Sequence, residues 1–123
     1  MRRRAGVAAA LALLGWGLVA AVSLAGEARA DQFAVTITGV YTPATIEVHA
    51  RDTVVWTNND TGLPGLLGGN PHTVVADDGS FASPNLAPGQ SFSQTFRKQG
   101  EYPYRCTIQP DMKGRVKVPQ SWL

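Results

Sequence analysis

The sequence predicts an all-β protein, a sandwich of about seven to eight short strands. Two observations predict this class. First, apolar and polar residues alternate in several short segments, and turns rich in Gly, Pro, Asn and Asp separate these segments. Second, no stretch after residue 30 repeats its apolar residues every 3.6 positions over the length of a helix. No internal repeat interrupts residues 31–123, so we expect a single domain.

The first expected strand is the clearest. Phe33, Val35 and Ile37 alternate with smaller or polar residues, which is typical of a strand buried on one face. The other segments that we expect to be strands begin at 46, 54, 72, 92, 102 and 115. The aromatic residues that we expect in the core are Trp56, Phe92, Phe96, Tyr102 and Tyr104. A buried tyrosine hydroxyl would need a hydrogen-bond partner.

One long segment, from Asn58 to Pro71, does not fit a strand because it contains four glycines and two prolines. Its three leucines, Leu63, Leu66 and Leu67, have two interpretations. They form either a lid over the core or an exposed apolar patch that docks a partner.

The first 30 residues have the three parts of a secretory signal. Arg2 to Arg4 supply the positive start, and residues 5–26 are uncharged and mostly apolar. Ala28-Arg29-Ala30 then places small residues at the two positions that a signal peptidase recognises. We therefore expect a signal peptide at 1–30 and a mature domain at 31–123. The alternative is an uncleaved membrane anchor, because the uncharged run is long enough to span a bilayer.

Charge gives no indication of a nucleic-acid partner once the leader is removed. The full chain has 11 Lys and Arg, 9 Asp and Glu, and a net charge of +2. Four of the basic residues and one of the acidic residues lie in the leader, leaving seven and eight. The expected mature domain then has a net charge of −1, so the positive net charge of the precursor comes from its expected export signal.

Cys106 is the one cysteine of the chain, so a disulfide within the domain is excluded. A single cysteine in an exported domain indicates an intermolecular bridge, a reactive thiol or a thiolate held by a metal ion.

The surroundings of Cys106 favour the metal. Period 2 places Cys106 on the same face as Tyr102 and Tyr104, so its sulfur is expected to point into the end of the sandwich. Met112 follows after a tight loop, and His72 lies where the Gly-rich segment enters a strand. A thiolate, an imidazole and a thioether at one end of a sandwich are ligands that suit copper.

The sequence at these positions resembles the cupredoxin family, and in particular its amicyanin, plastocyanin and pseudoazurin group. The similar segments are 52–59, Pro71-His72-Thr73-Val74, and Tyr102 to Cys106 with the short loop to Met112. The resemblance implies a Greek-key sandwich and one copper ion that cycles between Cu(I) and Cu(II). It also implies that His72, Cys106 and Met112 bind this ion.

The ligand loop departs from the family pattern at one position. The family has Cys-x-x-His-x-x-Met, whereas this chain has Gln109 where the histidine is expected. An amide oxygen is a harder and weaker donor for copper than an imidazole nitrogen. Gln109 is therefore a candidate ligand by position only. His49 is the other histidine, and alternation places it on an outward face.

Two functions follow from the sequence. The first is an exported electron carrier in the periplasm or outside the cell, whose partners are exported redox proteins that dock at the ligand-loop end. The alternative, suggested by Gln109, is a non-redox copper-binding or copper-free interaction module of the same fold. We expect no enzymatic activity, because no Ser-His-Asp set, paired-carboxylate motif or phosphate loop is present. Contact with a membrane is expected only if the signal is not cleaved.

Overall fold

The computed structural model describes residues 30–62 and 68–120, and within these residues the secondary structure is entirely β. The eight strands are β1 (Gln32–Ile37), β2 (Tyr41–Thr42), β3 (Thr45–Glu47), β4 (Thr53–Asn58), β5 (Val75–Ala76), β6 (Ser91–Thr95), β7 (Gly100–Arg105) and β8 (Lys113–Val118). The all-β prediction, including the strand number, is confirmed. In the described part of the chain no helix is long and apolar enough to cross a membrane.

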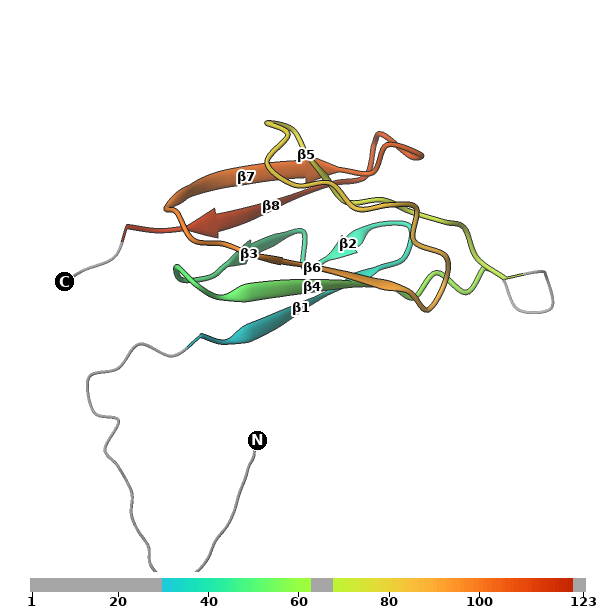
Figure 1. The fold of residues 1–123 in the computed structure, drawn as a ribbon. Coiled ribbons are helices and arrows are strands. Elements are labelled where there is room, and N and C mark those ends of the chain that lie inside the picture. The colour runs from blue at the N-terminus through green and yellow to red at the C-terminus, as the bar shows by residue number, and fades with distance from the viewer. Residues whose placement is uncertain (1–29, 63–67, 121–123) are drawn as a thin grey trace, which may run out of the picture.

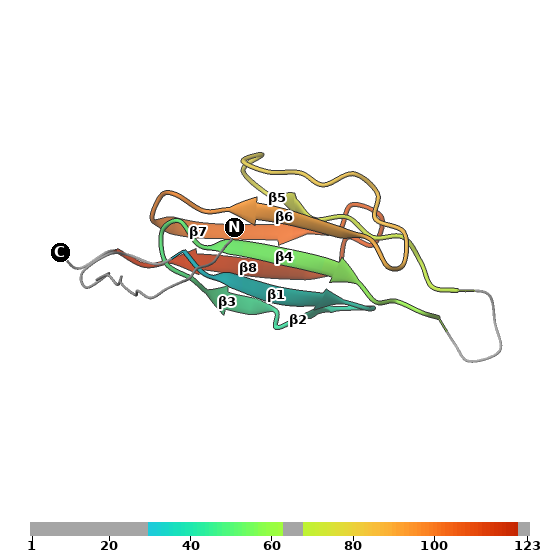
Figure 2. The same ribbon diagram turned by 60° about the horizontal axis from the view of Figure 1, so that its bottom comes forward.

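The strands form two four-stranded sheets that pack face to face (Figures 1 and 2). One sheet has the order β2-β1-β4-β6 and the other has the order β3-β8-β7-β5. The pairs β1–β4 and β3–β8 are parallel, and the remaining pairs are antiparallel. Because parallel neighbours need a connection that crosses the sandwich, local patterns in the sequence do not reveal these two pairings.

The core lies between the sheets and is centred on Trp56 of β4. Its indole ring lies 5.3 Å from the ring of Tyr104 and 5.8 Å from that of Phe81. Strand β4 alternates strictly between buried and half-buried residues, as expected for a central strand with one face on the core. Loss of these aromatic contacts is expected to lower the free energy of unfolding, because protein interiors are close-packed.

Two predictions about the aromatic residues are corrected by the structure. Phe92 and Tyr102 are only half-buried, because Phe92 lies on edge strand β6 and the Tyr102 hydroxyl reaches outward to the carbonyl of Lys98 at 2.8 Å. Tyr104 is buried, yet within the described residues its hydroxyl has no hydrogen-bond partner. Burial raises the pKa of Tyr104 to about 12, so the group stays neutral.

The two segments singled out in the sequence lie at one end of the sandwich. Figure 1 shows the β7–β8 loop and the chain between β4 and β5 together, opposite the end at which β1 begins and β8 ends. Leu63, Leu66 and Leu67, for which a lid or a docking patch was expected, lie outside the described residues, as do residues 1–29 of the expected signal peptide.

Candidate metal centre

The β7–β8 loop brings the two sulfur-containing residues to the base of one turn. Cys106 follows directly after β7, and Met112 directly precedes β8. The Cys106 amide donates to the Met112 carbonyl at 3.1 Å, and the Met112 amide donates to the Gln109 carbonyl at 2.9 Å. Both side chains are buried. The short loop therefore closes on itself, and its hydrogen bonds fix the spacing between the thiol and the thioether.

His72 meets this loop from the segment that connects β4 of one sheet to β5 of the other. Backbone hydrogen bonds in both directions with Leu86, at 3.1 and 2.8 Å, hold its main chain. Its imidazole is buried, and Nδ1 lies 3.7 Å from the Cys106 sulfur. Residues 34 positions apart in the sequence are thus brought into contact, as expected for two ligands of one ion.

The second ring nitrogen of His72 is occupied by a carboxylate. Nε2 lies 2.8 Å from Asp60 Oδ2, and the hydrogen bond from His72 is the main reason why the pKa of Asp60 is lowered. Since an ionised carboxylate only accepts, Nε2 carries the proton in this pair. The lone pair of a neutral imidazole is then on Nδ1, on the side of the Cys106 sulfur.

The surroundings of Cys106 lower the pKa of its thiol. Burial raises the pKa of its thiol, but hydrogen bonds from the backbone amides of Thr73, Gln109 and Ile108 act in the opposite direction, and the pKa is lowered overall. The Thr73 amide lies 3.4 Å from the sulfur. Because the thiolate is the form that binds metals, these donors favour metal binding.

The threonines beside the two ligands fasten the loops together. Thr73 Oγ1 accepts a hydrogen bond from the Thr107 amide at 2.8 Å and lies 2.9 Å from Thr107 Oγ1. Each threonine directly follows one of the converging residues, so the pair ties His72 to Cys106 through the backbone. The distance between imidazole and thiol is therefore set by the fold.

Gln109 lies in the same loop but is exposed. An open cavity of about 290 Å³ lies beside it, lined among others by Val40, Tyr41, Gln109 and Met112. A small molecule can thus approach the metal end of the sandwich from this side. Position 109 is where the resemblance implies a second imidazole, and the chain has no ring there.

His49 does not reach the site. It lies in the turn before β4, whereas His72 packs near the far end of that strand, and its side chain is 83% exposed. This position agrees with the outward face predicted from alternation. Within the described residues, no group of three or more His, Cys, Asp and Glu side chains is placed to hold a metal ion. The candidate donors are therefore one imidazole, one thiol and one thioether.

These three donors fit copper and fit harder ions poorly. Thiolate and thioether sulfur are soft, and an imidazole suits copper. Magnesium or calcium would need a shell of oxygen ligands instead.

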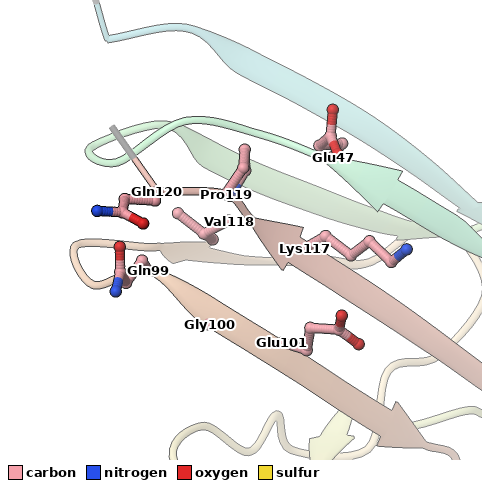
Figure 3. Close-up of a pocket in the computed structure, with 8 residues that line it drawn as sticks. All are labelled: Glu47, Gln99, Gly100, Glu101, Lys117, Val118, Pro119 and Gln120. Atoms are coloured by element: carbon pink, nitrogen blue, oxygen red, sulfur yellow. The ribbon is translucent and has the colours of Figure 1, made fainter. Parts of the chain in front are cut away.

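A larger cavity, of about 440 Å³, lies on the outer face of the β3-β8-β7-β5 sheet (Figure 3). Lys117 of β8 lies between its cross-strand neighbours Glu47 and Glu101, which come from β3 and β7. The three charged side chains lie in a row across neighbouring strands and do not converge on one point. We interpret this cavity as a solvated sheet surface.

Sequence analysis did not identify the residues that support the candidate ligands. The most important are Asp60, Thr73 and Thr107, together with Asn58, which is buried. Thr73 and Thr107 each follow a candidate ligand, and this adjacency was the available signal. Asp60 gave none, because it is an ordinary acidic residue in a Gly-rich segment twelve positions before His72.

Comparisons with known proteins show the family to which the chain belongs. The family model described as a cupredoxin-like domain matches residues 7–118. Chloroplastic plastocyanin of Tetradesmus obliquus is 33% identical over 85% of this chain and 72% of its own length. Amicyanin of Paracoccus denitrificans is 35% identical over 60% of this chain, a match that covers 56% of the relative.

The fold is also similar to that of a solved cupredoxin structure. A purple cupredoxin from Nitrosopumilus maritimus superposes with a TM-score of 0.60 at 29% identity. The superposition covers 70% of this chain and 98% of that protein. The similarity therefore spans the whole sandwich of that protein.

Proposed function

Because this chain belongs to the cupredoxin family, we propose that it is an exported copper protein that carries single electrons between redox proteins. One observation carries the proposal. The Nδ1 atom of the buried His72 lies 3.7 Å from the sulfur of the buried Cys106, whose amide is hydrogen-bonded to the Met112 carbonyl. An imidazole and a thiolate that converge in this way, with a thioether in the same loop, are three of the four ligands of a blue-copper electron-transfer site, which also has a second imidazole.

The fold would serve this function by holding the candidate ligands rigidly. His72, Cys106 and Met112 would hold the ion, which supplies a one-electron couple between Cu(II) and Cu(I). The Thr73–Thr107 hydrogen bonds and the closed β7–β8 loop keep these side chains in place before any ion binds. Ligands held rigidly in this way reorganise little when the charge changes, and small reorganisation favours rapid electron transfer.

The alternative function keeps the fold and omits the redox cycle. The observation that favours it is the exposed side chain of Gln109. With a weak donor at this position, the site would be a copper-binding or copper-free interaction module. Reversible one-electron reduction of the copper-loaded protein separates the two functions.

The partners of an electron carrier would be exported redox proteins that dock at the ligand-loop end. Apolar side chains are available there, because Ile108 in the loop is 45% exposed and Val40, which lines the same cavity as Met112, is 58% exposed. Such docking is typically weak and of small area, which lets a shuttle leave its partner quickly.

The test of the proposed function is to isolate the protein from an exporting host and measure its metal content and optical spectrum. We expect about one copper per chain, a cysteine-to-copper absorption, and reversible bleaching on one-electron reduction. Protein that takes up no copper, or copper that does not cycle, would contradict the electron-carrier proposal.

A further inference from the structure

The imidazole of His72 has two different neighbours, one for each ring nitrogen. Nδ1 faces the Cys106 sulfur, and Nε2 is 2.8 Å from the Asp60 carboxylate. The His72 ring is fully buried, and the Asp60 side chain is only 15% exposed. The hydrogen bond is therefore largely shielded from water, which makes it stronger than the same pair on an open surface.

The carboxylate is itself held by the fold. The Asp60 amide donates to Asn58 Oδ1 at 2.9 Å, and the amide of Asn58's side chain donates to the carbonyls of Asn70 and Leu86 at 2.9 and 2.8 Å. Gly69 packs directly against Asp60, since a Cβ atom at position 69 would lie 1.6 Å from the Asp60 carbonyl oxygen. These contacts hold the two ends of the segment between β4 and His72 together beside the Asp60 carboxylate.

We propose that Asp60 is a positioning residue for the copper site, which fixes the proton of His72 on Nε2 and presents Nδ1 to the metal. Its negative charge also strengthens the imidazole as a donor, as carboxylates paired with metal-binding histidines do. A stronger donor favours Cu(II) over Cu(I), and so it offsets part of what is lost where Gln109 replaces an imidazole. This proposal rests on the proposed function for its effect on copper, whereas its effect on the imidazole does not require the metal.

The test compares Asp60→Asn and Asp60→Ala with the control Asp111→Asn. Asp111 is an exposed carboxylate in the ligand loop, so its removal changes the charge near the site without touching His72. We expect Asp60→Ala to lower Cu(II) affinity by about 10–100-fold, the range for partners of ligating histidines. If Cu(I) affinity is unchanged, the reduction potential rises by about 59 mV for each tenfold loss. Asp60→Asn, which retains an acceptor oxygen, is expected to lie between Asp60→Ala and the unmodified protein.

A second readout uses the metal-free protein. Nitrogen NMR should find the His72 proton on Nε2 in the unmodified protein and in Asp111→Asn, and a mixture of tautomers in Asp60→Ala. If the tautomer depends on Asp60 but no variant binds copper, the proposed function fails and the positioning role stands. If Asp60→Ala keeps the tautomer, the Cu(II) affinity and the potential of the control, the positioning role is overturned. Thermal unfolding of each variant shows whether a loss comes from the fold alone.

A separate observation concerns the first residues of the described chain. Asp52 is only 1% exposed, and its carboxylate accepts hydrogen bonds from the amides of Asp31 and His49 at 2.9 and 2.8 Å. Within residues 30–62 and 68–120, the one basic side chain within 4.0 Å is that of His49, at 3.9 Å and largely exposed. A buried carboxylate usually has a closer cation.

We infer that signal-peptide cleavage supplies this cation. Hydrolysis of the Ala30–Asp31 bond by the host peptidase leaves a carboxylate on the leader and an amine on Asp31, which takes up a proton. The new ammonium group then lies where the amide now donates to Asp52. Export processing would thus replace a neutral amide donor with a charged ammonium group, and the hydrogen bond to the Asp52 carboxylate would become an ion pair, which is stronger.

The test uses precursors exported by a host, with and without one Ser inserted between Ala30 and Asp31. N-terminal sequencing is expected to find Asp31 first in the natural protein and Ser first in the insertion, which moves the charge away but keeps the Asp31 amide. The insertion should lower the unfolding temperature by roughly 4–8 °C, the shift expected for about 1 kcal/mol in a domain of this size. In an Asp52→Asn background the insertion should leave the unfolding temperature unchanged.

Two results would overturn this inference. One is a mature chain that begins at a residue other than Asp31. The other is an insertion that leaves the stability unchanged while Asp52 is present. If Asp52→Asn does not fold, NMR titration of the terminal ammonium decides instead, because an ion pair should raise its midpoint above that of the insertion variant.

Discussion

Replacing Cys106 with serine is expected to abolish copper binding while the sandwich stays folded. The thiolate is the strongest of the three donors, and a serine hydroxyl is neither soft nor ionised at neutral pH. The fold should survive because no disulfide is lost and serine can still accept the Thr73 amide. The cost in unfolding free energy is expected to be about 1–3 kcal/mol, which is less than the stability of a typical domain.

Copper stoichiometry and circular dichroism of Cys106→Ser measure these two effects. His49→Gln is the matched control, since it removes the other histidine of the chain from an exposed position and should leave copper binding unchanged. Copper bound to Cys106→Ser at the original stoichiometry would place the site elsewhere.

Replacing Gln109 with histidine is expected to increase the affinity for Cu(II) by about tenfold or more, equivalent to ~1.4 kcal/mol for each factor of ten. The reason is that an imidazole nitrogen is a better donor for copper than an amide oxygen. Position 109 lies three residues from Cys106 in a loop whose backbone is already fixed by the Met112–Gln109 hydrogen bond. The variant should therefore gain a strong blue cysteine-to-copper absorption without refolding of the loop.

Free imidazole provides an independent form of the same experiment. The cavity beside Gln109 and Met112 is open, so added imidazole is expected to shift the copper spectrum of the unmodified protein toward that of Gln109→His. Ile108→His is the matched control, because it adds an imidazole to the neighbouring exposed position of the loop. A protein that is already fully blue, binds copper as tightly as the variant and ignores imidazole would refute this account of Gln109.

Much of the fold could be predicted from the sequence because its signals are local. Alternation along β1 and β4 places Val35, Ile37, Val54 and Trp56 on the core, and all four are buried. Cys106 and Met112 are close in sequence, so the turn between two strands brings them together. The parallel β1–β4 and β3–β8 pairs were not predicted, because nothing within either strand specifies a partner that lies across the sandwich.

The candidate site was predicted less completely. His72 was identified through the resemblance to cupredoxins, since a lone histidine beside a Gly-rich segment does not by itself indicate a ligand. Asp60 was missed because its role depends on a contact with Nε2 of His72 that only the folded chain creates. The half-burial of Phe92 was missed because the position of β6 at a sheet edge is a property of the topology.

The coordination shell of copper in the unmodified protein tests the central claim most directly, and X-ray absorption at the copper edge measures it. We predict a short copper–sulfur bond from Cys106 and the scattering of one imidazole ring, that of His72. A shell without sulfur, or one with two imidazole rings, would contradict the site described above.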